Sequence, residues 1–252
     1  MRDTTRNSPY SFLPSLDRQR RGGMVQRVQD LIREAIVRHE LKPGTFIDKA
    51  ALCAQLGVSR FPVSEALGRL ADQKLVEVLP QRGTRVTFID LADCSEAMFV
   101  RRALEVETVR TIAARADDSF LTRIEQNLSD QRAMLQADNR DGFYELDLAF
   151  HDLCLSELGF DRVQSAVEGA RASLNRMRLL LLTPERRPRA YAEHIEIAEA
   201  LKQRDPEAAA RAMEKHLNTV MKELLACADK YPDAFAKEPV EVAVPLEKRN
   251  AG

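Results

Sequence analysis

Histidines and one aspartate at helical spacing are the residues of this sequence best suited to bind a metal ion. Three of the four histidines, His151, His194 and His216, lie on apolar stripes with helical period, so we expect their rings to face the interior of a bundle. Asp147 precedes His151 by four residues, which places both side chains on one helix face. Three imidazoles and one carboxylate suit a divalent transition metal such as Zn, Ni, Co or Mn, without selecting among them.

A single inward histidine is more often a hydrogen-bonded core residue than a metal ligand. Three of them together with a well-spaced aspartate reverse that preference. The metal has three possible roles at this point: it anchors a small ligand, it is purely structural, or it is itself the regulated signal. His39 lies between charged residues at a helix end and is interpreted as a surface residue.

Arg101 is the other residue with candidate binding chemistry. It is in phase with Cys94 and Met98, so its guanidinium is expected to point into the same bundle. A buried arginine needs an anion and can hold a carboxylate through two hydrogen bonds. That anion is either a small acidic ligand or an internal carboxylate, Asp147 or Glu105. A five- or six-coordinate ion with four protein ligands keeps a position open for such an acid.

The overall composition bounds the type of protein. The chain has 252 residues, of which 44% are hydrophobic and 31% charged, as expected for one or two globular domains. No run of about 18 apolar residues predicts a membrane span, and the N-terminal segment lacks the apolar core of a signal peptide. The four cysteines lie too far apart for a disulfide framework or a paired-cysteine metal site, which favours a reduced, cytoplasmic protein: Cys53, Cys94, Cys154 and Cys227.

The charges are distributed unevenly along the chain. Residues 1–90 hold 15 Lys and Arg against 10 Asp and Glu, and residues 91–252 hold 23 against 29. Because residues 1–90 carry a net positive charge and residues 91–252 a net negative charge, a polyanion, if the protein binds one, is expected to contact the N-terminal third.

The N-terminal third has the pattern of a small helical domain that ends in a hairpin. Apolar positions three and four apart predict a helix from Val25, which ends before Pro43-Gly44. A short helix follows the N-cap Asp48 and stops at Gly57, and another follows the N-cap Ser59. Two strands then flank a turn at Pro80-Gln81-Arg82-Gly83. Helix, helix, helix and hairpin is the order of a winged helix-turn-helix, predicted over residues 24–89.

The rest of the chain is predicted to be an all-α bundle over residues 90–229. We expect a flexible arm over 1–23 and a disordered tail over 230–252. The predicted fold class is therefore mainly α, with a winged helix-turn-helix followed by an all-helical ligand-binding domain. The expected bundle helices are 91–115, 118–137, 142–158, 161–182, 190–204 and 206–229.

Several stretches of the sequence resemble a known family. The segments LKPG at 41–44, LGVSRFPVSEAL at 56–67, LV at 75–76 and RG at 82–83 are similar to the GntR family of bacterial transcription regulators. VRRALE at 100–105, DLAFH at 147–151, Glu193-His194 and His216 resemble the FCD-type, metal-containing ligand-binding domain of its FadR subgroup. The resemblance implies metal ligands at Asp147, His151, His194 and His216, and an effector-binding role for Arg101. It also implies a homodimer that represses transcription until an acidic effector binds.

In a helix-turn-helix the N-terminal residues of the second helix contact base edges in the major groove. Here these residues are Ser59, Arg60, Phe61 and Ser64, and Arg60 can donate two hydrogen bonds to a guanine. Arg82, at the hairpin tip, is a candidate for the minor groove or the backbone, and Lys49 for a phosphate. Without the motif these arginines would be read as solvated surface charges.

The operator sequences of relatives cannot be transferred to this chain. Family members often carry further arginines at positions where this sequence has Ala50 and Ser64.

The leading hypothesis is a non-enzymatic DNA-binding regulator that binds a pseudo-palindromic operator as a homodimer and responds to a small organic acid. One alternative is a metal-dependent hydrolase or oxygenase fused to a DNA-binding module. It lacks a general base, because Glu145 and Glu196 turn away from the metal ligands. Another alternative is a regulator that responds to acyl-CoA, which a polar metal site in the cavity disfavours.

Overall fold

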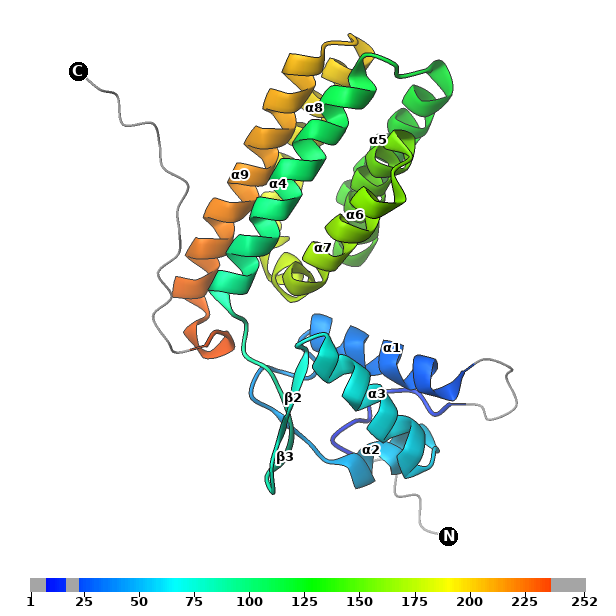
Figure 1. Cartoon of the computed structure of the whole chain (residues 1–252), viewed down its shortest axis with the longest axis vertical. Coiled ribbons are helices and arrows are strands. Elements are labelled where there is room, and N and C mark those ends of the chain that lie inside the picture. Colours follow the sequence, from blue (N-terminus) through cyan, green and yellow to red (C-terminus); the bar gives the residue numbers. More distant parts are fainter. Residues whose placement is uncertain (1–7, 17–22, 237–252) are drawn as a thin grey trace, which may run out of the picture. The chain divides into compact units, whose positions relative to one another are not determined.

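The computed structural model describes residues 8–16 and 23–236 of the chain. These residues form two compact units: one runs up to Ile89 and also includes residues 231–236, and the other spans Asp90–Lys230 (Figure 1). Among the described helices, none is long and apolar enough to cross a membrane. The first unit is mixed, with a small sheet, and the second is wholly helical, so the predicted fold class is confirmed.

The first unit is a winged helix-turn-helix. Its three strands form an antiparallel sheet in the order β1-β3-β2, and β1 pairs through Phe46 with Arg85 and through Ile47 with Thr84. The hairpin was predicted, but β1 was missed, because a two-residue strand has no alternation and is defined only by its distant partner. The elements are α1 (Met24–Val37), β1 (Phe46–Ile47), α2 (Lys49–Leu56), α3 (Arg60–Asp72), β2 (Val76–Leu79) and β3 (Gly83–Val86).

The turn between α2 and α3 has the local structure that the sequence predicts. The Asp48 carboxylate accepts hydrogen bonds from the backbone N–H groups of Ala50 and Ala51, and so caps α2. Gly57 ends α2 with φ 68°, a left-handed conformation that glycine adopts without strain. Ser59 takes the N-cap position of α3, but its side chain makes no capping hydrogen bond.

Part of the predicted flexible arm is packed into this unit. Tyr10 and Leu13 are buried in the same hydrophobic core as the apolar residues of α1 and α2. The Tyr10 hydroxyl accepts a hydrogen bond from the backbone N–H of Asp48 at 2.7 Å, and the Gln55 side chain donates one to the Leu13 carbonyl at 2.7 Å. The prediction of an arm over 1–23 is therefore wrong for residues 8–16, because two isolated apolar side chains show no period. Residues 1–7 and 17–22 lie outside the described residues.

Truncating Tyr10 tests this packing. Because the ring is buried, we expect Tyr10→Ala to lower the free energy of unfolding by about 3–5 kcal/mol. Tyr10→Phe removes only the hydrogen bond to Asp48 and should cost about 1 kcal/mol. The measurement is urea unfolding of the full chain, with the exposed Phe12 changed to Ala as the matched control. Equal stabilities of the Tyr10→Ala and Phe12→Ala variants would contradict the burial.

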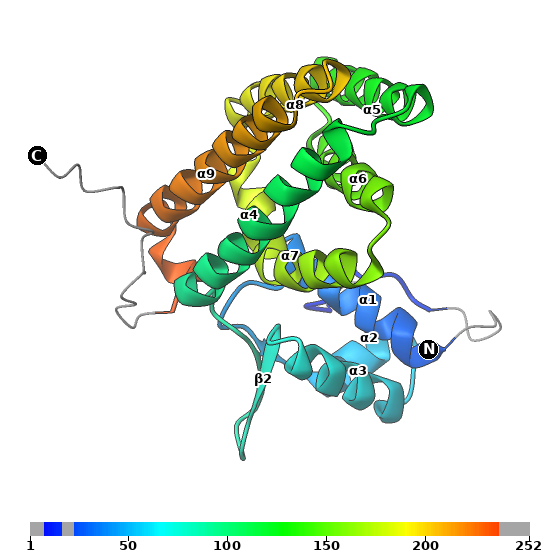
Figure 2. The same cartoon turned by 45° about the horizontal axis from the view of Figure 1, so that its top comes forward.

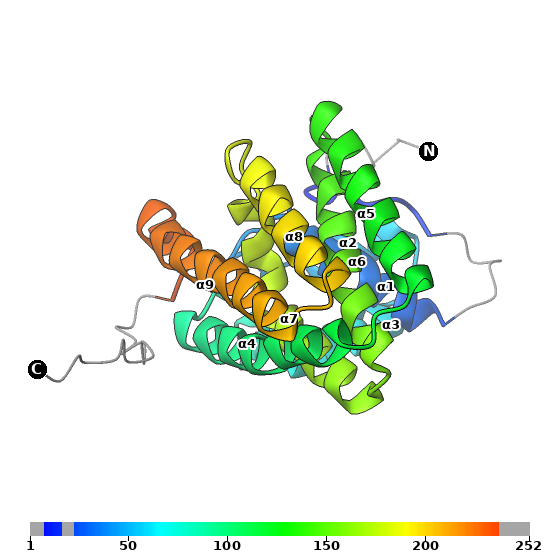
Figure 3. The same ribbon diagram turned by 90° about the horizontal axis from the view of Figure 1, so that it is seen from above.

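The second unit is a bundle of helices. Helix α4 packs against α6, α7 and α9, while α5 packs against α6 and α8, and α8 against α9 (Figures 2 and 3). The positions of five helices agree with the prediction within a few residues. The helices are α4 (Leu91–Ala113), α5 (Asp118–Gln136), α6 (Arg140–Leu158), α7 (Asp161–Leu181), α8 (Arg186–Lys202) and α9 (Pro206–Lys230).

Helix α8 begins four residues earlier than expected. The expected helix starts at 190, which leaves 185–189 outside it, but Arg186 and Arg187 belong to α8 and are buried. The hydroxyl and carbonyl oxygens of Thr183 accept the N–H of Arg186, so Thr183 starts the helix. Pro188 lies in the first turn, where no intrahelical hydrogen bond needs its missing N–H.

The segment after α9 returns to the first unit. Pro232–Ala234 form the short helix η2, and Phe235 is buried. The backbone of Ile89 donates to Ala234 and accepts from Ala236, both at 2.9 Å. The prediction of a disordered tail over 230–252 is therefore wrong for residues 231–236, where non-local backbone pairing replaces a local pattern. Residues 237–252 lie outside the described residues.

Candidate metal centre and nucleic-acid interface

Three helices of the bundle bring three histidines together. His151 comes from α6, His194 from α8 and His216 from α9, and each is at most 2% exposed. One ligand nitrogen from each ring lies within 4.8 Å of the others. The structure therefore assembles the histidine cluster that the sequence predicts.

Asp147 joins this cluster. It lies one helical turn before His151 on α6, and its carboxyl Oδ1 is 3.6 Å from Nε2 of His194. Its side chain also borders the same small cavity as His216. The four predicted ligands thus meet in the bundle interior, and an aspartate buried to this degree needs a cation nearby.

An oxygen acceptor lies beside the Nδ1 nitrogen of each ring. Nδ1 of His151 faces the Glu105 carboxylate at 2.7 Å, and Nδ1 of His194 faces the Gln131 amide oxygen at 3.0 Å. Nδ1 of His216 faces the Glu193 carboxylate at 2.8 Å. Because a carboxylate and an amide oxygen accept hydrogen bonds, this arrangement favours the tautomer in which Nδ1 carries the proton and Nε2 keeps a lone pair. This tautomer and its oxygen partner are typical of metal-binding histidines.

Two of the rings are shifted toward the neutral form that a metal ligand requires. Burial lowers the pKa of His151, and burial together with His151 and Arg186 holds the pKa of His216 well below its usual range. Nε2 of His151 has no hydrogen-bond partner among the described residues. A neutral imidazole whose buried lone pair has no donor can coordinate a cation, so the chemistry of these residues fits a divalent transition metal.

Arg101 points inward as predicted, and its partner in the structure is Glu105. Nε and Nη2 of Arg101 contact the two carboxylate oxygens at 2.6 and 3.3 Å. Arg171 from α7 lies 3.9 Å from the same carboxylate. Burial alone would raise the pKa of Glu105, but Arg101, His151 and Arg171 hold it well below its usual range. Glu105 therefore stays ionised and orients His151.

Sequence reasoning missed two of the three oxygen partners. Gln131 is fully buried on α5, and its amide nitrogen donates to the side chain of Asn127 at 2.7 Å, which turns the amide oxygen toward His194. In the sequence Glu193 was noted only as the neighbour of His194, yet its carboxylate contacts Nδ1 of His216. The sequence signal for Gln131 is that a polar residue lies in phase with the buried apolar positions of its helix. This signal predicts burial but not the contact with His194, because His194 comes from another helix.

Removing the Gln131 oxygen should weaken metal binding. Gln131→Leu keeps the size of the side chain but leaves Nδ1 of His194 without its acceptor, so the metal affinity should fall by about 10–100-fold. Competition with a chromophoric chelator measures this affinity. Gln126→Leu, an exposed change on the same helix, is the control and should have no effect. Equal affinities of the two variants would contradict the role of Gln131.

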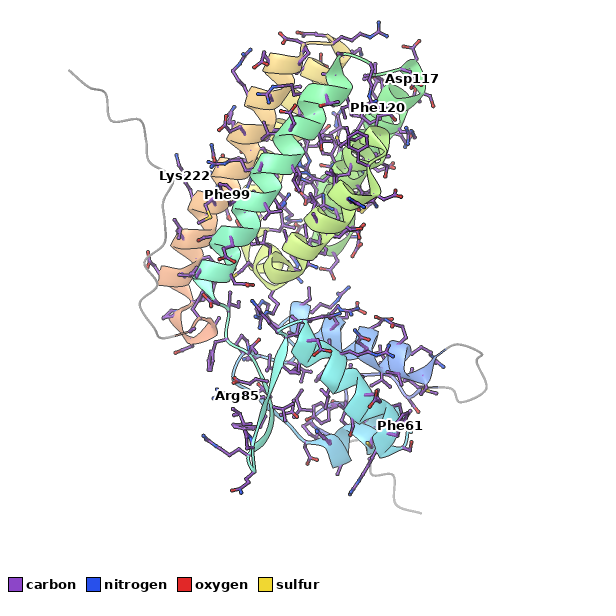
Figure 4. The ribbon with its side chains drawn as sticks, viewed as in Figure 1. Phe61, Arg85, Phe99, Asp117, Phe120 and Lys222 are labelled. Carbon is purple, nitrogen blue, oxygen red and sulfur yellow. The ribbon has the colours of Figure 1, made fainter. Side chains whose placement is uncertain are left out.

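The predicted DNA-contacting residues lie on the surface of the first unit. Arg60, Phe61 and Ser64 are exposed on the first two turns of α3, and Phe61 is 69% exposed (Figure 4). Ser59 precedes them at the N-cap, and Lys49 is partly exposed at the start of α2. An exposed helix start presents both side chains and backbone N–H groups to a ligand.

Arg82 is exposed at the tip of the β2–β3 hairpin, in a turn that uses positive φ at Gln81 and Gly83. The neighbouring arginine of the hairpin, Arg85 (Figure 4), is held within the sheet. It forms an ion pair with Glu77 at 2.9 Å and lies over the ring of Phe46. Arg82 rather than Arg85 is therefore the available cation of the hairpin.

Comparisons with known proteins agree with this architecture. Residues 24–86 match the model of the gntR family of bacterial regulatory proteins, and residues 96–219 match the FCD domain. The chain is 30% identical over 214 residues to the HTH-type transcriptional repressor RspR of Escherichia coli, covering 84% of this chain and 94% of that protein. The chain belongs to the GntR family.

Other relatives have the same organisation. A regulator from Streptomyces ambofaciens is 33% identical, covering 84% of this chain and 90% of its own length. The crystal structure of a GntR regulator from Rhodococcus sp. RHA1 has a TM-score of 0.70 at 23% identity, covering 81% of this chain and 99% of its own. This GntR protein is thus a DNA-binding transcriptional regulator with an FCD domain of the FadR subgroup. The prediction that it is not an enzyme is confirmed by its relatives, which are regulators.

Proposed function

We propose that this regulator is a repressor whose affinity for operator DNA is set by a small organic acid. The acid binds at a divalent transition metal held by Asp147, His151, His194 and His216. The buried cluster of three histidines carries this proposal, because one ligand nitrogen of each ring lies within 4.8 Å of the others and an oxygen acceptor lies beside each Nδ1. The ion supplies Lewis acidity and open coordination positions for a carboxylate oxygen.

The DNA-binding unit acts as one half of a homodimer. Each α3 enters the major groove of one half-site, where Ser59, Arg60, Phe61 and Ser64 face the bases. Arg82 and Lys49 contact the backbone or the minor groove and set the position on the duplex. A two-fold symmetric protein then selects a pseudo-palindromic operator.

The bundle is the sensor. From α4, Arg101 pairs with Glu105, and Glu105 faces His151 of the metal site. Loss of Arg101 is therefore expected to alter the response to the acid. Since the coupling between two binding sites is reciprocal, operator DNA must change the affinity for the acid by the same factor that the acid changes the affinity for DNA. Relief of repression by the acid follows if the acid-bound state binds DNA less tightly.

Native mass spectrometry of the purified full chain, with elemental analysis of the same sample, tests this function. The expected species is a dimer with one transition-metal ion per chain and the added mass of a small acid. A metal-loaded dimer to which no acid binds, with unchanged operator affinity when acids are added, would make the metal structural. A metal-free dimer would return the histidines to the role of ordinary core residues.

A further inference from the structure

Arg186, in the first turn of α8, is a buried arginine that the metal site itself does not use. Its side chain is 5% exposed. Nη2 contacts the Glu193 carboxylate at 2.7 Å, and Nε contacts the Glu223 carboxylate at 2.5 Å. Nη1 has no hydrogen-bond partner among the described residues. Arginine stays charged at any ordinary pH, so Nη1 is a buried donor that lacks an acceptor.

This donor lies beside the candidate metal centre. A cavity of about 20 Å³, enough for one water molecule, is bordered by Arg186 and by two of the proposed metal ligands, Asp147 and His216. Aliphatic side chains form the rest of its wall, together with Glu223: Leu181, Leu182, Ala190 and Val220. A guanidinium, a metal site and an apolar wall around one space match a short-chain carboxylic acid. Arg101 is not part of this wall, and Glu105 occupies two of its nitrogens.

The two carboxylates on Arg186 differ in how firmly they are held. Glu193 also accepts from Nδ1 of His216, and its side chain is 12% exposed. Glu223 is 22% exposed, and its other partner, Arg189 at 3.5 Å, is a surface residue with 64% exposure. The carboxylate oxygens of Glu223 are buried, but its second partner is a surface arginine that can follow it, whereas Glu193 is also held by His216.

We propose that Arg186 anchors the carboxylate of the effector and that Glu223 is the internal carboxylate that the effector displaces. This inference rests on the proposed function, that is, on an acid sensed at the metal site. The ligand class is a small acid with a short aliphatic part. One carboxylate oxygen accepts from the guanidinium of Arg186, and a second oxygen faces the ion held by Asp147 and His216. The cavity is large enough for one water molecule only, so Glu223 must move away to make room for the acid.

Calorimetric titration of the zinc-loaded full chain tests this assignment. The probes are acetate, lactate, succinate and citrate, with acetamide and lactamide as uncharged counterparts. We expect one or more of the acids to bind and the amides not to bind. Arg186→Lys keeps the charge but loses the planar fork, so it should weaken binding of the acid by about tenfold or more at unchanged zinc content.

Glu223→Gln gives the opposite and more specific result. Because it removes the competing carboxylate from Arg186, it should strengthen binding of the acid several-fold, whereas a purely structural ion pair would leave binding unchanged or weaken it. Glu196→Gln, an exposed change on α8 that breaks the pair with Lys215, is the matched control. The Glu223 variant also keeps the proposal testable if the Arg186 variant does not fold.

Three results would overturn the proposal: no binding of any of these acids to the wild type, equal binding to wild type and folded Arg186→Lys, or weaker binding to Glu223→Gln. The last two results overturn the role of Arg186 and leave the proposed function standing, whereas a wild type that binds no zinc, or that binds zinc but no acid, contradicts the proposed function itself. The same titrations on metal-free protein then measure the contribution of Arg186 without the ion. An acid affinity that falls in Arg186→Lys and rises in Glu223→Gln supports the proposal that Arg186 anchors the carboxylate. An affinity that is unchanged in both variants overturns it.

Discussion

Replacing Arg60 by alanine is expected to abolish sequence-specific DNA binding while leaving the fold intact. Arg60 is exposed at the first residue of α3, where its guanidinium can reach O6 and N7 of a guanine. Such a contact contributes about 1–3 kcal/mol of discrimination, and a dimer makes it in each of two half-sites. The combined loss of about 2–6 kcal/mol reduces specific binding toward the non-specific level.

The measurement is fluorescence anisotropy on an operator selected from a random duplex pool by the wild-type protein. Arg69→Ala is the matched control, since Arg69 is an exposed arginine near the end of the same helix. A phosphate contact at Arg69 would weaken binding to operator and to unrelated DNA equally, and would reduce the salt dependence of binding. Unfolding curves establish that both variants fold. If Arg60→Ala binds the operator as tightly as the wild type, α3 is not the recognition helix as assigned.

The second large effect is expected from the double variant His151→Ala, His194→Ala. Two of the four proposed ligands disappear, and they come from different helices, so no local rearrangement can replace them. Elemental analysis should find less than about a tenth of the wild-type metal content, because structural transition-metal sites depend on a complete ligand set. The response of operator affinity to added acid should disappear with the metal.

His39→Ala is the control for this experiment, because His39 lies outside the bundle, just after α1. Its metal content should equal that of the wild type. The double variant also leaves Glu105 and Gln131 without their histidine partners, so its free energy of unfolding should fall. Metal content and operator affinity should therefore be measured well below the melting temperature of the variant. Full metal stoichiometry in the double variant would show that the ion binds elsewhere.

The structure changes the interpretation of several individual residues. Tyr10 and Phe235 lie in segments without apolar period, and each is buried by contacts far away in the sequence. Arg186 lies between two prolines in a charged stretch that is typical of a loop, but it starts a helix and is buried. In each case the local pattern is uninformative, because the stabilising partner is non-local.

The sequence by itself determined the order of elements and the family. Helix periods, the N-cap Asp48 and the C-terminal Gly57 are local features, so they predict helices and the helix-turn-helix before any tertiary contact is known. Helical phase also showed that His151 and Asp147 share one face, because a spacing of four residues determines this directly. The inward orientation of His194, His216 and Arg101 followed from the same periodicity.

Only the tertiary structure decided which groups meet around the cluster. Gln131, Glu105 and Glu193 come from three helices, and each places an oxygen on a different ring nitrogen. A single helix shows which of its faces is buried, but not which residue of another helix it will contact, since that depends on the packing and axial register of the bundle. For the same reason, sequence phase placed Arg101 in the interior, and only packing showed that Glu105 is its partner and that Arg186 borders the cavity.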